Sequence, residues 1–246
     1  MSRFARALGA LSLTAVAGAC NAGLDVNADA GLQLQLATVN GNAPATSAPE
    51  TIVVGTDVIV LESVQLVLRQ IELEGVDGAC ADSTVSDDCA EIEIGPMIVD
   101  LPLNGGAEHA ISAQVLAGTY DEIKFKVHRP ESGSADDQAF IQANPTFADV
   151  SIRVIGTWNG EPFAYEGQQG YEQEISLTTP IVVTDAPAHL TLATDVGMWF
   201  VNEAGTGLVD PRLALTGLAF ESLVEHNIEL SFEAFEDDDR DGQADN

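Results

Sequence analysis

The chain has 246 residues, 46% of them hydrophobic, so it is long enough to bury a core as one large domain or two small ones. Lys and Arg total 9 against 39 Asp and Glu, which gives a formal net charge of -30 at pH 7. A field of this sign repels phosphate backbones and anionic lipid headgroups, and it argues against nucleic-acid binding. The excess acid indicates either a solvated surface or cation binding.

Residues 1–19 have the features of a secretory signal peptide. Two arginines precede an apolar run from Ala7 to Ala17 that is too short to span a bilayer, and Ala-Gly-Ala supplies small residues before a cleavage site. Cys20 follows directly. This order resembles the lipobox of bacterial lipoproteins, although Ala17 stands where Leu or Val is commoner. We expect cleavage before Cys20 and lipidation of its thiol.

A lipidated Cys20 predicts an exported protein that contacts the membrane through its anchor only, with residues 20–30 as a polar tether. By the sorting habit of such lipoproteins, Asn21 after the Cys indicates the outer membrane or cell surface. Ala-Gly-Ala is also a good ordinary signal-peptidase site. The alternative is therefore a soluble periplasmic or secreted protein.

Residues 31–216 are predicted to form one β-sandwich domain. From Gly118 to Pro130, apolar residues alternate with charged ones, which is the period-two pattern of a half-buried strand. The apolar phase changes near Arg69-Gln70, which predicts a bulge, and Asn159-Gly160 between alternating runs predicts a hairpin. Short strands separated by turns indicate an all-β, antiparallel, immunoglobulin-like sandwich of about ten strands.

A resemblance to a known family rests on the Ala-Gly-Thr-Tyr-Asp-Glu-Ile run that ends at Ile123, on Val99-Asp100-Leu101 and on the acidic C-terminus. Together these resemble a group of bacterial secreted lipoproteins known as a domain of unknown function. The resemblance covers roughly residues 30 to 200. It implies a transthyretin-like β-sandwich, and no catalytic residue can be carried over from it.

In residues 217–236 the spacing of the apolar residues changes. Phe220, Val224, Ile228 and Phe232 recur every four residues, and Ser222-Leu-Val-Glu has the spacing of a capping box. The pattern predicts a short terminal helix from about 223 to 235. The alternative is a strand that uses Ile228, Leu230 and Phe232.

Cys80 and Cys89 lie in one loop between two predicted strands. If lipid occupies Cys20, these thiols form an even pair in an oxidising compartment, which predicts a disulfide between them. Zinc is the weaker alternative because two Cys without nearby partners fall short of four ligands.

The acidic tail, residues 237–246, carries Asp237, Asp239, Asp241 and Asp245 around Gly242 in the pattern D-x-D-x-D-G-x-x-D. Carboxylates at alternate positions can turn towards one cation, and Gly allows the sharp bend, so calcium is the predicted cofactor. The pattern lacks a bidentate Glu at position twelve and a second helix, which predicts weak binding. The alternative is a solvated tail that binds only counterions.

Other side chains give little support for catalysis. His109, His128, His189 and His226 are scattered, and no G-x-S-x-G nucleophile elbow is present. Tyr165, Tyr171, Trp158 and Trp199 could form a carbohydrate platform, although core packing is the more ordinary use of such residues.

These observations favour a non-enzymatic, lipid-anchored envelope module that binds an unknown protein or glycan, or a structural module. The alternative is a carbohydrate-active hydrolase with carboxylates that the sequence does not identify. A groove with two close carboxylates, one of raised pKa, would favour the hydrolase.

Overall fold

The computed structural model describes residues 31–39, 49–76, 90–104, 107–115, 117–184 and 186–245. The predicted signal peptide, the tether, Cys20, Cys80 and Cys89 lie outside these residues, and their roles stay predictions. Eleven strands lie in the described part: β1 (Gly31–Val39), β2 (Glu50–Val54), β3 (Asp57–Gly75), β4 (Ala90–Asp100), β5 (Glu108–Ala113), β6 (Gly118–Val127), β7 (Ile152–Trp158), β8 (Glu161–Gly167), β9 (Tyr171–Val183), β10 (Pro187–Asp195) and β11 (Phe232–Glu236). The helical segments are α1 (Ala135–Ala143), η2 (Pro145–Phe147), η3 (Pro211–Leu213) and α2 (Glu221–Glu229).

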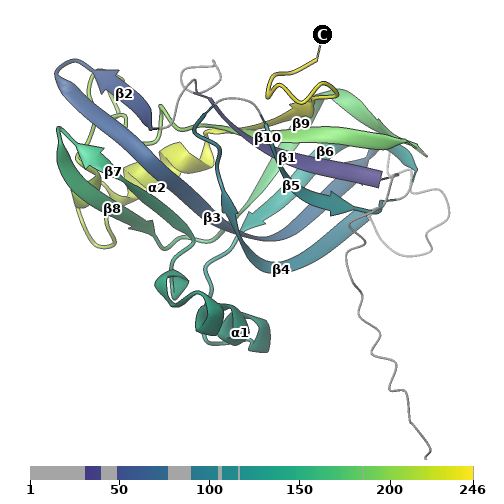
Figure 1. The fold of residues 1–246 in the computed structure, drawn as a ribbon, viewed down its shortest axis with the longest axis horizontal. Coiled ribbons are helices and arrows are strands. Elements are labelled where there is room, and N and C mark those ends of the chain that lie inside the picture. Colours follow the sequence, from purple (N-terminus) through teal and green to yellow (C-terminus); the bar gives the residue numbers. More distant parts are fainter. Residues whose placement is uncertain are drawn as a thin grey trace, which may run out of the picture.

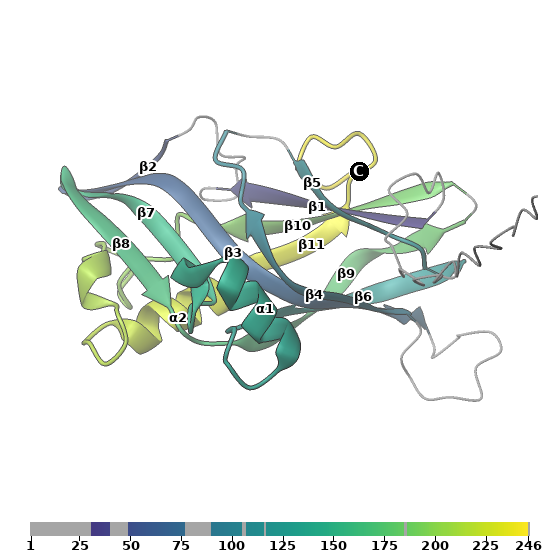
Figure 2. The same cartoon turned by 60° about the horizontal axis from the view of Figure 1, so that its bottom comes forward.

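The strands form two facing sheets, which confirms the all-β sandwich (Figure 2). The smaller sheet has the order β11-β10-β1-β5, and the larger has the order β8-β7-β3-β6-β9 with β2 and β4 also paired to β3. Strand β3 is 19 residues long, so its first half pairs with β2 and β7 and its second half with β4 and β6. Every paired neighbour is antiparallel except β1 with β10, which is parallel.

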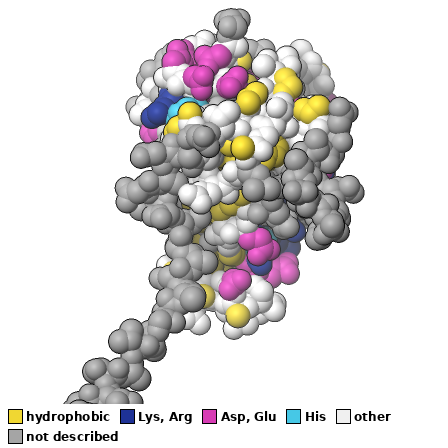
Figure 3. All heavy atoms as spheres, turned by 90° about the vertical axis from the view of Figure 1, so that its right-hand side faces the viewer, with side chains coloured by type: hydrophobic (Ala, Val, Ile, Leu, Met, Phe, Trp, Pro, Cys, Tyr) yellow, Lys and Arg dark blue, Asp and Glu magenta, His cyan; other side chains and the backbone are white. Residues whose placement is uncertain are grey.

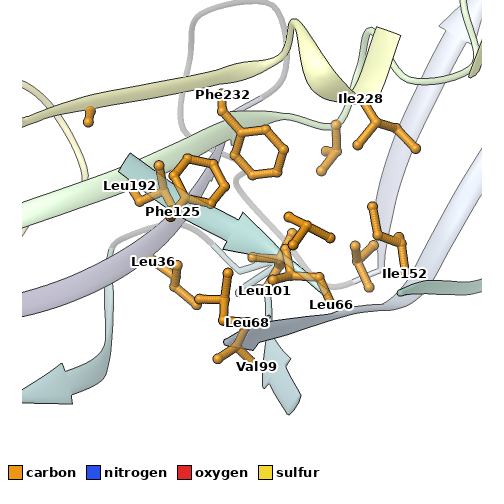
Figure 4. Close-up of a cluster of buried hydrophobic side chains, with 14 of the residues drawn as sticks. Leu36, Leu66, Leu68, Val99, Leu101, Phe125, Ile152, Leu192, Ile228 and Phe232 are labelled. Atoms are coloured by element: carbon orange, nitrogen blue, oxygen red, sulfur yellow. The ribbon is translucent and has the colours of Figure 1, made fainter. Parts of the chain in front are cut away.

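The core lies between the sheets, where side chains from both layers point towards one another (Figure 4). Phe125 of β6 and Phe232 of β11 meet edge to face, with ring centroids 5.1 Å apart. The larger sheet extends beyond the smaller one at the β7–β8 end (Figure 1). There Phe200 packs edge to face against Tyr165 at 5.6 Å, and Ile228 of α2 joins the same core. Burial of this apolar area is the main stabilising contribution to the fold.

Two local predictions within the larger sheet are confirmed. The register of β3 shifts between Leu68 and Gln70 against both β4 and β6, which places the bulge at the predicted position. Asn159 and Gly160 connect β7 to β8 with φ values of 50° and 84°. Positive φ at both central residues is what a type I′ hairpin turn requires.

Helix α1 covers part of the outer face of the larger sheet. The Ser134 hydroxyl accepts a hydrogen bond from the Asp137 amide at 3.0 Å and so caps the helix. Phe140 packs with Val67 and Phe147 in a second, smaller apolar cluster. Within the described residues, no helix is long and apolar enough to cross a membrane.

The terminal helix is shorter than the predicted 223–235. Helix α2 ends at Glu229, and the chain then forms β11 from Phe232. The spacing of four arose because Val224 and Ile228 are buried residues of the helix, whereas Phe232 is a buried residue of the strand that follows. The helical prediction was therefore right for the first half of the segment, and the strand alternative was right only for Phe232.

The predicted capping box at the start of this helix is wrong. Ser222 lies inside the helix, and the N-cap position is Phe220, which makes no side-chain capping bond. Glu221 instead accepts a hydrogen bond from the Gly217 amide at 2.5 Å with its Oε2. A carboxylate in the first turn also complements the helix dipole.

Candidate metal centre

The C-terminal loop, residues 237–245, leaves β11 and folds against the outer side of the smaller sheet (Figure 2). The Asp237 amide donates to the His189 carbonyl of β10 at 3.2 Å. The Asp245 amide donates to the Glu236 carbonyl at 3.2 Å, and the Asp238 amide donates to Asp245 Oδ2 at 2.7 Å. The two ends of the loop therefore meet, and the acidic tail is a closed turn in this structure.

Asp237 holds the loop on the sheet. Its side chain is 0% exposed, and its Oδ2 accepts from the Thr191 hydroxyl at 2.7 Å and from the Gly242 amide at 3.0 Å. Its Oδ1 accepts from the Asp241 amide at 3.0 Å. Gly242 has a φ of 80°, the left-handed region that favours glycine, so this residue type makes the bend.

Three of the four predicted ligand residues come together. One carboxylate oxygen each from Asp237, Asp239 and Asp241 lie within 4.8 Å of one another, with Asp237 buried and the other two exposed. Asp245 is not in this group, because its carboxylate closes the loop at the Asp238 amide. The D-x-D-x-D spacing thus gives a group of three carboxylates, and the fourth Asp supports the loop.

The acidic side chains of the loop lie close enough together to perturb one another. The charge of Asp241 raises the pKa of Asp239 above its ordinary value, and burial followed by the charges of Asp238 and Asp245 raises the pKa of Glu236. None of the ion pairs in the described part of the chain includes an acidic residue of this loop. Acidic side chains also gather at the top of the face shown in Figure 3. A cation bound here would relieve this repulsion.

The donor set suits a hard divalent cation. Calcium takes six to eight oxygen ligands, which can include carboxylates, carbonyls and water. A carboxylate has about four lone-pair positions, and Asp237 uses three of them for hydrogen bonds, so one on Oδ1 remains for an ion. The loop therefore offers about one oxygen from each of Asp237, Asp239 and Asp241, and the open side leaves room for water ligands.

A second group of carboxylates lies on the outer face of the larger sheet. Glu74 of β3, Glu122 of β6 and Glu174 of β9 surround Lys124, whose ammonium forms ion pairs with all three. Burial first, and then hydrogen bonding with Glu74, raises the pKa of Glu122 to about 7. The Lys124 ammonium lowers the pKa of Glu74. A hydrolase site would need two close carboxylates, one of raised pKa, in a groove. The carboxylates meet the first of these two requirements.

The other requirement is a groove. The crevice beside this group is lined by side chains of β3, β6 and β9, including Gln70 and Glu172, and is too shallow to hold a water molecule. Lys124 lines this crevice, whereas Glu74 and Glu122 do not. A sugar bound there would lack the enclosed walls that carbohydrate-active sites use to orient substrate.

Two other sequence candidates, His128 and Trp199, have structural roles. His128 Nε2 donates to the Asp137 carboxylate at 2.8 Å, and Arg69 pairs with the same carboxylate. Burial alone would raise the pKa of Asp137, but the hydrogen bond from His128 and the nearby charges lower it overall. Trp199 is 0% exposed and donates its ring N–H to Ser231, so it belongs to the core and not to a carbohydrate platform.

Sequence reasoning missed Thr191, which fixes the first Asp of the loop. Thr191 and Asp237 are 46 residues apart, and they meet only because β10 pairs with β11. A single polar residue on the outer side of a strand carries no local sign of such a contact. The apolar residues Leu190 and Leu192 on either side do indicate that Thr191 lies on the other face of the strand.

Searches against protein-family models, curated proteins and solved structures each found no match. The resemblance to secreted lipoproteins and the transthyretin-like architecture therefore stay predictions.

Proposed function

We propose that this chain is an exported, lipid-anchored, non-enzymatic β-sandwich module of the cell envelope whose C-terminal loop binds calcium. The observation that carries the proposal is the loop itself. Asp237, buried and hydrogen-bonded to Thr191, holds the loop so that Asp239 and Asp241 converge with it within 4.8 Å. The sequence pattern alone did not require any contact between these side chains.

Calcium fits better than a softer or smaller ion. The group offers only oxygen donors, which excludes the thiolate and imidazole ligands that zinc and copper favour. An open, three-carboxylate loop does not impose the near-ideal octahedron that magnesium demands. Few protein ligands predict a dissociation constant of about 0.1 to 1 mM, as in extracellular calcium modules.

The non-enzymatic part of the proposal is supported by the placement of the acids. The Glu74–Glu122 pair already has a lysine counter-ion, and the crevice beside it is too shallow to hold a water molecule. His128, which lies 2.8 Å from a carboxylate, is next to strand β6 and links it to helix α1 through Asp137. Both arrangements are explained as structural contacts between elements.

Calorimetry with calcium chloride tests the proposal. Wild-type protein should show saturable binding, and calcium at about ten times the dissociation constant should stabilise by about 1.4 kcal/mol, which raises Tm by about 3 to 6 °C. The double variant Asp239→Asn/Asp241→Asn should lose both effects. The variant Asp136→Asn/Glu203→Gln removes the same charge from two exposed sites and should respond like wild type. An unsaturable response, or one that the first variant retains, would remove calcium from the proposal.

Intact-mass analysis of membrane-fraction protein tests the anchor. The mature chain should begin at Cys20 and carry acyl mass, because the lipobox-like order places the cleavage directly before that residue. Cys20→Ala should release the protein from the membrane fraction. Recovery of unmodified wild-type protein only from the soluble fraction would replace the anchor with ordinary secretion.

A further inference from the structure

A polar hollow of about 300 Å³ lies on the outer side of the smaller sheet, next to the C-terminal loop. Its walls come from β1, from β5 with the residue before it, and from the loop: Gln33, Gln35, Ala107, Ser112 and Arg240. Gln33 and Ser112 are direct cross-strand partners, so their side chains share one face of the sheet. Residues far apart in the sequence therefore converge on one concave surface.

A buried imidazole supports the rim of this hollow. His189 is 7% exposed and lies between Gln35 and Arg240, with its Nδ1 3.4 Å from the Gln35 amide group and its Nε2 3.4 Å from Arg240 Nη2. A guanidinium only donates, so Nε2 accepts and Nδ1 carries the proton. The Gln35 atom that faces Nδ1 is its amide nitrogen, Nε2, and exchanging the amide oxygen and nitrogen would give Nδ1 an acceptor. This chain of contacts holds the guanidinium against the sheet.

Arg240 forms no ion pair with a carboxylate of the described residues, although it stands between two aspartates in the sequence. Most basic side chains of the described part form ion pairs with Asp or Glu: Arg69, Lys124, Arg129, Arg153 and Arg212. Arg240 is in none of the ion pairs found there. In a chain with a net charge of -30, a guanidinium that is turned towards a hollow and not towards its acidic neighbours retains most of its five donors for a ligand.

We propose that this hollow binds a sugar acid, with Arg240 taking its carboxylate. Guanidinium and carboxylate match as two parallel hydrogen bonds. Amide and hydroxyl side chains both donate and accept, so Gln33, Gln35 and Ser112 suit the hydroxyl groups of the ring. A volume of about 300 Å³ is at the small end for ligand sites, which fits a single sugar unit.

The charge around the hollow limits the ligand to one carboxylate. Asp239 and Asp241 flank Arg240 in the chain, and the whole protein repels polyanions. Calcium in the loop would neutralise these two neighbours and so strengthen the hold on an anionic ligand. This coupling rests on the calcium binding proposed above, whereas the contact with Arg240 does not.

Calorimetry with glucuronate, with glucose and with a neutral oligosaccharide carrying one glucuronate tests the proposal, each with and without calcium. Wild type should bind glucuronate but not glucose at concentrations up to about 20 mM. Arg240→Gln should weaken glucuronate binding at least about tenfold, the loss of one charge-assisted contact. Arg212→Gln, an exposed arginine that pairs with Asp210, should leave binding unchanged.

The outcomes separate the two proposals. Tighter binding of the oligosaccharide identifies a glycan-borne sugar acid, and binding of glucuronate alone identifies a free one. Glucuronate binding that depends on Arg240 but not on calcium would support the sugar-acid site and contradict its coupling to calcium. Saturable calcium binding without glucuronate binding would support the metal site and contradict the proposal that the hollow binds a sugar acid. Equal binding of glucose and glucuronate, or an unchanged affinity in Arg240→Gln, also overturns it.

Discussion

Two groups of carboxylates lie on the outer faces of the sandwich, and the repulsion between their like charges is compensated differently in each. On the larger sheet, Glu74, Glu122 and Glu174 surround Lys124. On the smaller sheet, three aspartates of the C-terminal loop converge, and none of them is in an ion pair found among the described residues. The first group lies on three paired strands, and the second lies on one loop held by a single buried side chain.

The difference shows where each group obtains its counter-charge. Strand pairing places Lys124 directly opposite Glu174, so an ammonium is always within reach, and the pKa of Lys124 is raised by its hydrogen bond with Glu74. None of the loop's carboxylates is in an ion pair with a described basic side chain, although Arg240 lies in the loop, and the charge of Asp241 raises the pKa of Asp239. We therefore expect the strand-borne group to depend on the protein's own lysine and the loop to depend on ions in solution.

Removal of the loop's buried anchor should have the largest effect. Asp237→Ala leaves the Thr191 hydroxyl and the Asp241 and Gly242 amides without their acceptor, and such losses cost about 2 to 3 kcal/mol together. Thermal unfolding should show Tm lower by about 5 to 10 °C, and the calcium response should be lost. The matched control is Asp245→Ala, which removes an exposed acceptor from the same loop and should cost less than about 1 kcal/mol. Equal losses in the two variants would show that Asp237 is not the anchor.

Removal of Lys124, the counter-ion of the strand-borne group, should have the second-largest effect on stability. In Lys124→Met the three glutamates lose their common partner, so Tm should fall. Because Lys124 lowers the pKa of Glu74, that pair contributes stability above the ordinary glutamate pKa, and the contribution is lost as pH falls through the lowered value. The Tm difference from wild type should therefore be larger at neutral pH than in strong acid.

Lys126→Met is the control for this variant. Lys126 lies two residues along the same strand and is in none of the ion pairs found in the described part of the chain. Both substitutions remove one positive charge from the same face. A similar loss of Tm in both would mean that net charge, and not the glutamate group, sets the effect.

Much of the fold follows from local patterns. Alternation at Ile123, Phe125 and Val127 identifies a half-buried strand because the two faces of a strand repeat every second residue. The phase change at Arg69 and the Asn159-Gly160 turn are local as well, and both are found where the sequence places them. The C-terminal helix was extended too far because the buried positions of a helix and of the next strand happened to continue one spacing.

Contacts across the sheets could not be predicted in the same way. Glu74 faces Glu122 only because the bulge between Leu68 and Gln70 sets the register of β3 against β6. The parallel pairing of β1 with β10 and the contact of Asp237 with Thr191 also join distant segments. The aspartate group was predictable because alternate positions of one short loop can converge without any distant partner.

The smallest expected effect comes from Glu122→Gln. The Glu122 Oε1 atom is buried without a hydrogen bond, 3.7 Å from the Lys124 ammonium, and Glu74 and Glu174 are the like charges that face it. Its pKa of about 7 in the folded protein lies above the ordinary 4.5, so the folded state binds this proton more tightly than the unfolded chain. The group's contribution to stability is therefore complete below the ordinary value and is lost as pH rises through about 7.

Gln has nearly the same shape and never ionises, so Glu122→Gln should be more stable than wild type at pH 8 and should flatten the change of Tm between acid and neutral pH. Glu62→Gln removes the same charge from an exposed position of β3 and should keep the wild-type profile. Identical pH profiles in the two variants would contradict the role of the buried carboxyl. A flattened profile in Glu122→Gln alone would locate the pH dependence in the strand-borne group, where strand register and a lysine hold carboxylates close together.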